Sequence, residues 1–121
     1  MGLGLPGKWS IQVNGRPKSD SYAGNLRGAK HGGQPYALVV RSTMSVEPDY
    51  DKAMGLLYAS NLAAPCYMVM AGDRAFQGAI LTLDRNGQHE FGTPPIRRLN
   101  PNMGVWFLVE TNDDLNAMAS D

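Results

Sequence analysis

The polar residues behind the last apolar run of the chain are the first candidates for chemistry. Residues 105–109 read VWFLV, and Glu110, Thr111 and Asn112 follow at once, with two aspartates after them. An asparagine at the end of a strand commonly caps or turns the chain. Its side-chain N–H can also donate to an oxyanion that develops during a reaction. Composition alone favours the turn, and the catalytic donor stays open as the alternative.

The single cysteine, Cys66, is a second candidate, since a thiolate beside a base is a common nucleophile. Cys66 lies inside the apolar run CYMVMAG, and neither His31 nor His89 is near it in sequence. Free cysteines in such surroundings are usually buried and inert, so a structural role is favoured. One cysteine excludes an internal disulfide and a thiolate zinc cluster. We expect both histidines in exposed loops, and neither a metal nor another cofactor.

Two pairs of carboxylates could do acid and base work. Asp49 and Asp51 precede an apolar stripe, where acids suit the start of a helix. Asp113 and Asp114 follow Asn112 in a turn. Structural roles are favoured for both pairs.

Charge and length exclude several classes of protein. The 121 residues contain 11 Lys plus Arg and 11 Asp plus Glu, so no net charge would attract nucleic acid or an anionic membrane. No apolar run approaches the ~20 residues of a membrane-spanning helix. The segment after Met1 lacks the features of a signal peptide. The glycines of GLGLPG and KHGG lack phosphate-loop spacing and are expected in flexible connectors.

The first half of the chain predicts one strand, a loop and two helices. KWSIQVNGR alternates apolar and polar residues, which is typical of a half-buried strand. Residues 15–35 lack apolar periodicity, so we expect a long mobile loop that is a lid, a pocket wall or disordered. PYALVVRSTM has helical spacing, although its adjacent valines also suit a strand. EPDYDKAMGLLYASNLAA is the clearest helix, with a proline and acids at its start.

The second half predicts strands. CYMVMAG is a short buried strand, and AFQGAILTLDRNGQHEF suggests a hairpin that turns at Asn86-Gly87 and returns through Phe91. VWFLVET is expected to be the last strand. The order of elements predicts one α+β domain over residues 1–121, with two helices packed on one face of a mostly antiparallel sheet.

Four segments, taken in order, resemble acid ceramidase and N-acylethanolamine acid amidase, which are N-terminal-nucleophile hydrolases related to the choloylglycine hydrolases. The segments are PGKWSIQVNGR, YDKAMGLLYASNLAAPCYMVMAG, GAILTLDRNG and VWFLVETNDD. In the family they read Pro-Gly-apolar-Phe-Ser-Leu-x-Leu-Asn-Glu-Arg, then Tyr-Glu-Glu-Ala with Ala-Pro-x-Tyr, then Arg-Asp-Arg, then Gln-Thr-Asn-Tyr-Asp. The resemblance covers roughly residues 6 to 114.

This resemblance implies a four-layer αββα fold in which an amino-terminal cysteine attacks the amide of an N-acyl lipid, with its own α-amino group as base. It implies that Asn112 helps hold the oxyanion and that Asn14 lies near the nucleophile. Arg16 matches the family arginine and is expected to bind substrate. Gly15 replaces the family glutamate, which leaves that carboxylate without an equivalent here.

The family's nucleophilic cysteine precedes the part that PGKWSIQVNGR matches, and Cys66 stands where the family has alanine. We therefore expect an incomplete amidase-like domain, the central portion of a ceramide or N-acylethanolamine hydrolase, that does not hydrolyse amides by itself. A partner chain or a homodimer would complete the sheet. The full-length family pattern implies a lysosomal or endomembrane location. The alternatives are a non-catalytic binding or structural protein on the same scaffold, or an accidental likeness.

Overall fold

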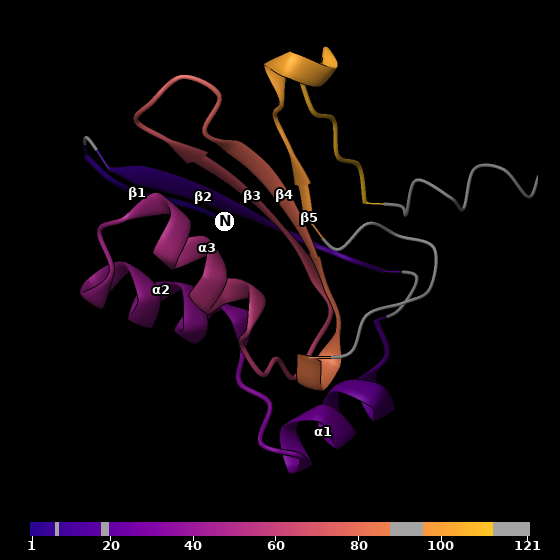
Figure 1. The fold of residues 1–121 in the computed structure, drawn as a ribbon. Helices are drawn as coiled ribbons and strands as arrows, with labels where there is room; N and C mark the ends of the chain where they lie inside the picture. Colours follow the sequence, from indigo (N-terminus) through magenta and orange to yellow (C-terminus); the bar gives the residue numbers. More distant parts are fainter. Residues whose placement is uncertain (7, 18–19, 88–95, 113–121) are drawn as a thin grey trace, which may run out of the picture.

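The computed structural model describes residues 1–6, 8–17, 20–87 and 96–112. Five antiparallel strands form one sheet in the order β1-β2-β3-β4-β5, and helices α2 and α3 cover one of its faces (Figure 1). The elements are β1 (Gly2–Leu5), β2 (Trp9–Gly15), α1 (Tyr22–Lys30), α2 (Tyr36–Val46), α3 (Tyr50–Tyr58), β3 (Cys66–Gly72), β4 (Gly78–Leu83), the 3₁₀ turn η1 (Arg85–Gly87), β5 (Ile96–Arg98) and the 3₁₀ turn η2 (Pro101–Met103). The α+β class expected from the sequence is confirmed.

Strand β2 shows how the sequence pattern assigns the two faces of the sheet. Trp9, Ile11 and Val13 are buried, while Ser10 and Gln12 between them are exposed. In the register Ile11 lies opposite Met70 and Val13 lies opposite Met68, and these side chains share the core with the helices. The alternation in the sequence therefore places the odd-numbered residues of β2 against α2 and α3.

The two expected helices form where the sequence predicted them. Asp49 caps α3, because its side chain accepts a hydrogen bond from Lys52 N at 2.9 Å. This confirms a structural role for Asp49 at the helix start. Met54 and Leu57 fill the core under α3, at 2% and 0% exposure. The Asp113 and Asp114 pair lies outside the described residues.

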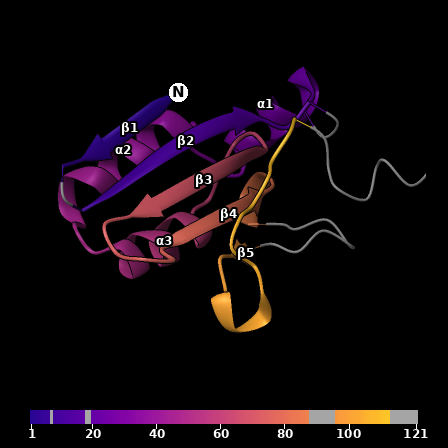
Figure 2. The same ribbon diagram turned by 90° about the horizontal axis from the view of Figure 1, so that it is seen from above.

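The loop expected over residues 15–35 is wrong in its middle, because α1 occupies Tyr22–Lys30. Ser21 caps the helix by accepting from Gly24 N at 3.1 Å. The helix lacks an apolar stripe, so periodicity could not reveal it. Contacts from elsewhere in the chain hold it at one end of the sheet (Figure 2): Asn86 Nδ2 donates to Gly28 O at 3.1 Å, and Arg85 Nε donates to Asn25 Oδ1 at 2.9 Å.

Gly28 makes α1 sensitive to a single methyl group. A Cβ at this position would lie 2.5 Å from the carbonyl oxygen of Ala63, whereas a Cβ at Gly55 in α3 would meet nothing within 4 Å. We expect Gly28→Ala to lower the free energy of unfolding by about 1–3 kcal/mol through overpacking. Gly55→Ala should raise it by about 0.5–1 kcal/mol, because alanine favours the helix. Urea unfolding of both variants checks this, and equal effects would contradict the close approach of α1.

One predicted connector is a strand in the structure, and the predicted hairpin is described only in part. GLGLPG, expected to be a connector, supplies β1 at the edge of the sheet, where it pairs with β2 from Gly2 to Leu5. Asn86 and Gly87 have the positive φ values of an Asn-Gly turn, 53° and 69°. The return strand through Phe91 lies outside the described residues. Further along the chain, β5 pairs antiparallel with β4.

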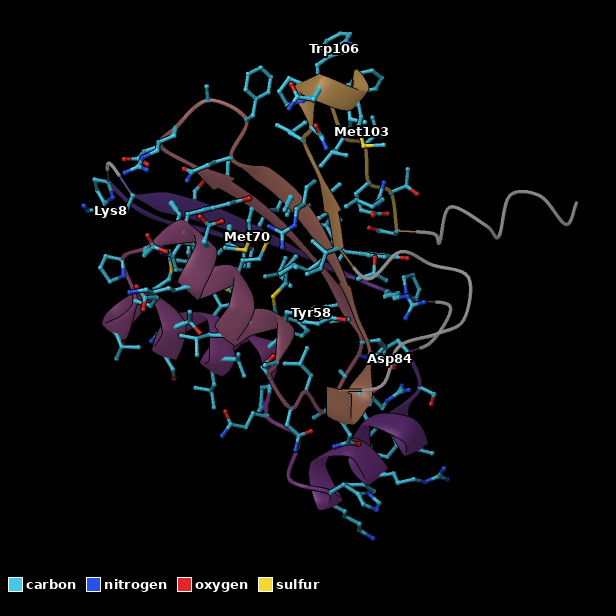
Figure 3. All side chains as sticks on the ribbon, viewed as in Figure 1. Lys8, Tyr58, Met70, Asp84, Met103 and Trp106 are labelled. Carbon is cyan, nitrogen blue, oxygen red and sulfur yellow. The ribbon has the colours of Figure 1, made fainter. Side chains whose placement is uncertain are left out.

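The strand expected at residues 105–111 is wrong within the described chain. Val105 forms one bridge with Asn100, and residues 106–111 then run without strand assignment. Trp106, Phe107 and Val109 are 71%, 58% and 58% exposed, so their apolar side chains have little to pack against. Trp106 and Met103 lie at the opposite end of the sheet from Asp84 (Figure 3). A strand needs a ladder partner, and this segment is held along β5 by the side chain of Arg97 instead.

Candidate functional site on the second face of the sheet

The face of the sheet turned away from α2 and α3 carries a row of polar side chains, and we call it the second face. Asn14 lies opposite Tyr67 in the register, and Tyr67 lies opposite Thr82. Tyr67 and Thr82 are 1% and 5% exposed, although the helices pack on the other face. Asn14 is half-buried, and its Oδ1 accepts from Gln12 Nε2 at 3.2 Å. The second face therefore carries buried polar side chains at Tyr67 and Thr82, while Ser10 and Gln12 on the same face are exposed.

Arg16 extends this row just beyond the end of β2. Its side chain is 1% exposed, and Nη1 lies 3.4 Å from Asp84 Oδ2. Its Cζ lies 5.9 Å from the centre of the Tyr67 ring, a cation–π contact. Asp84 also accepts from Arg85 N at 2.7 Å. The guanidinium is thus held between a carboxylate and an aromatic ring at one end of the sheet.

The segment that carries Asn112 also reaches this face. It leaves η2, runs over the side of the sheet opposite the helices and heads toward the end of β2, as the two ribbon views agree (Figures 1 and 2). Asn112 itself is exposed, at a bend. The structure therefore brings the segment ending at Asn112, the end of β2 with Asn14, and buried Arg16 to the same face.

Polar residues on this face that the sequence did not single out are Tyr67, Thr82, Asp84, Arg97 and Glu110. The sequence could have marked Asp84 as a candidate, because a charged residue directly after an apolar strand often belongs to a functional site. Tyr67 and Thr82 looked like ordinary strand residues. Among the described residues, Thr82 Oγ1 and Arg97 Nε are buried without a hydrogen-bond partner. Such groups are rare in folded proteins and point to further contacts on this face.

Cys66 is buried on the helix face of the sheet, at 0% exposure, as the sequence predicted. Burial raises the pKa of its thiol to about 12, and the nearby Arg16 only partly offsets this. A thiol that stays protonated at neutral pH is a poor nucleophile. The burial and the raised pKa both favour a structural role for Cys66.

The buried thiol predicts slow modification and a pH-dependent stability. At pH 8, we expect an excess of a thiol reagent to label Cys66 only at the rate at which the chain opens, and at once in denaturant. An unfolded thiol ionises near pH 8.5, so the stabilisation is complete below that pH and is lost as the pH rises toward about 12. Cys66→Ala should remove this part of the pH dependence. Rapid labelling of the folded chain would contradict the burial.

Other features of the described residues do not add a catalytic group. His31 is exposed at the end of α1, where its Nδ1 contacts Arg27 O at 2.8 Å, while His89 lies outside the described residues. Within the described ranges, no group of His, Cys, Asp and Glu is arranged to hold a metal ion. None of the helices in those ranges has the length and apolar character to cross a membrane. A polar cavity of about 390 Å³ lies between α1 and η1, next to Asp84 and Arg85.

The chain is similar to amide hydrolases of lipids. No protein-family model matches it. Acid ceramidase of Balaenoptera acutorostrata scammoni is 27% identical over 115 residues, which cover 90% of this chain and 27% of that protein. N-acylethanolamine-hydrolyzing acid amidase of Rattus norvegicus is 29% identical over 109 residues, covering 90% of this chain and 29% of that protein.

A solved structure agrees with these relatives. The Caenorhabditis elegans N-acylethanolamine-hydrolyzing acid amidase ortholog superposes with a TM-score of 0.73 at 25% identity, over 96% of this chain and 48% of that one. The ordered motifs, the helices α2 and α3 on one face of an antiparallel sheet, and both kinds of relative point the same way. The chain therefore belongs to the family of acid ceramidases and N-acylethanolamine acid amidases, and it spans less than a third of the curated relatives it matches.

Proposed function

We propose that this chain is the central portion of a hydrolase of N-acyl amides, ceramide or N-acylethanolamine, and that its second face contributes to the active site. In this proposal Asn112 donates to the oxyanion, Asn14 lies beside the nucleophile, and Arg16 binds substrate. The observation that carries it is the path of residues 105–112, which brings an exposed asparagine toward the end of β2. An exposed side-chain amide is free to meet a substrate carbonyl.

The chemistry requires a thiol that this face does not supply. A cysteine thiolate attacks the amide carbonyl, the carbonyl oxygen becomes an oxyanion, and Asn112 donates an N–H to it. The α-amino group of that cysteine takes the thiol proton and passes it to the leaving amine. Water then hydrolyses the thioester and releases the fatty acid. Cys66 cannot take this role, because it lies on the helix face and its pKa is raised to about 12.

The second face also supports a partner layer in the proposal. Thr82 Oγ1 and Arg97 Nε, buried and unpartnered among the described residues, would find hydrogen bonds in a further sheet. A partner chain or a homodimer would supply that layer. Arg16 is 1% exposed and pairs with Asp84, so the described chain by itself does not present its guanidinium to a substrate. Its part in binding is proposed from the matched family arginine alone.

The test is an assay of fatty acid release from ceramide and from N-acylethanolamines. We expect no turnover by the 121 residues alone, and turnover when a chain with the amino-terminal cysteine and its following arginine and aspartate is joined or co-expressed. Robust turnover by the 121 residues alone would overturn the proposal that this chain is inactive by itself. A correctly folded combined protein that binds these lipids without cleaving them would favour the non-catalytic alternative.

A further inference from the structure

Arg97 ties strand β5 to the segment that ends in Asn112. Arg97 lies opposite Ile80 in the register, with its side chain on the second face. Its Nη1 donates to the carbonyl oxygen of Val109 at 3.0 Å, and its Nη2 forms an ion pair with Glu110 Oε2. One guanidinium thus contacts the backbone and the side chain of two successive residues.

Glu110 also binds the backbone of Thr111, the residue before Asn112. While Oε2 pairs with Arg97, Oε1 accepts a hydrogen bond from the backbone N–H of Thr111 at 3.1 Å. The Glu110 side chain is only 4% exposed and that of Arg97 is 15% exposed, so the pair is largely removed from water. Charge-assisted hydrogen bonds are strong in such surroundings. The backbone at residues 109–111 is therefore fixed to β5 by side chains.

We propose that Arg97 and Glu110 are positioning residues that set the direction of Asn112. The inference rests on the proposed role of Asn112 as an oxyanion donor. Residues 106–111 have no strand assignment, so the bonds from Arg97 and Glu110 do for this segment what a ladder does for a strand. An oxyanion donor must be held in place before the reaction, because a donor that reorients during the step loses much of its effect.

The two acceptors at Val109 and Glu110 fit an arginine at position 97 better than a lysine. A guanidinium presents N–H groups in a planar fork, so it can serve the Val109 carbonyl and the Glu110 carboxylate together. A lysine keeps the charge but meets one acceptor well. Arg98, the next residue on β5, is exposed and provides a matched control with the same charge and the same strand.

The test compares Arg97→Ala, Arg97→Lys, Glu110→Ala and the double variant Arg97→Ala/Glu110→Ala with Arg98→Ala, in the 121-residue chain. NMR follows hydrogen exchange of the Thr111 amide and the side-chain amide signals of Asn112. We expect the Thr111 amide to exchange at least about tenfold faster in Arg97→Ala and in Glu110→Ala. The double variant should exchange no faster than either single variant, and Arg97→Lys should lie between Arg97→Ala and the unchanged chain. Arg98→Ala should leave both signals unchanged.

Unchanged exchange at Thr111 in Arg97→Ala would overturn the proposal, as would equal effects of Arg97→Ala and Arg98→Ala. In the complete amidase, Arg97→Ala should lower kcat about tenfold with little change in KM. Combined with Asn112→Ala, it should lower kcat no further than Asn112→Ala does alone. If exchange responds as expected while Asn112→Ala leaves kcat intact, the positioning stands and the proposed role of Asn112 fails. The two failures are therefore distinguishable.

Discussion

Asp84→Ala is expected to lower the free energy of unfolding by about 3 kcal/mol, because it removes the Asp84 carboxylate from its ion pair with the buried guanidinium of Arg16. Arg16 is 1% exposed, and the Arg16–Asp84 separation is 3.4 Å. The value is at the lower end for buried pairs, since Asp84 keeps 16% of its side chain exposed and Arg16 also has Tyr67 beside it. Urea denaturation at neutral pH measures the change as a shift of the midpoint at constant slope.

Two further variants separate the buried charge from other causes. Asp73→Ala removes an exposed carboxylate from the β3–β4 connection and should change stability by less than about 0.5 kcal/mol. Arg16→Met/Asp84→Ala removes both charges and should recover much of the loss, because methionine fills the space of the arginine stem. A double variant no more stable than Asp84→Ala would show that the loss comes from packing. If Asp84→Ala were as stable as Asp73→Ala, the buried Arg16–Asp84 pair would not contribute to stability as predicted.

The sequence predicted the elements that have strong local signals. Alternation identified β2, an acid cap and an apolar stripe identified α3, and the apolar run at Cys66 identified β3. Helix α1 escaped because its two glycines and polar residues carry no stripe, and its position depends on Asn86 and Arg85 from far along the chain. A helix held by tertiary contacts has little local pattern to read.

The error at residues 105–111 has a different cause. VWFLVET has the composition of a buried strand, and composition reports what a segment would do once it has a partner. In the described chain the Arg97 side chain takes the place of that partner, and Trp106 and Phe107 stay exposed. For the site, Asn112, Asn14 and Arg16 came from a motif resemblance. The Arg97–Glu110 pair is visible only in the structure, because two residues 13 positions apart form no recognisable sequence pattern.

Asn112→Ala is expected to lower kcat of the complete amidase by about 10²–10³, with KM little changed, because it removes one donor to the oxyanion. Asn102→Ala is the matched control: Asn102 is exposed in η2, has no role in the proposed site, and its substitution should leave kcat unchanged. Fatty acid release from an N-acylethanolamine, measured at several substrate concentrations, separates kcat from KM.

Asn112→Asp decides between the donor and the turn. An asparagine that only turns the chain uses its side-chain oxygen, which aspartate supplies equally well, so Asn112→Asp would then keep activity. A donor to an oxyanion must offer an N–H, which aspartate lacks, and its carboxylate would repel the developing negative charge. The proposal therefore expects Asn112→Asp to lose at least as much kcat as Asn112→Ala. Retained activity in Asn112→Asp, together with loss in Asn112→Ala, would return Asn112 to a structural role at the bend where it lies.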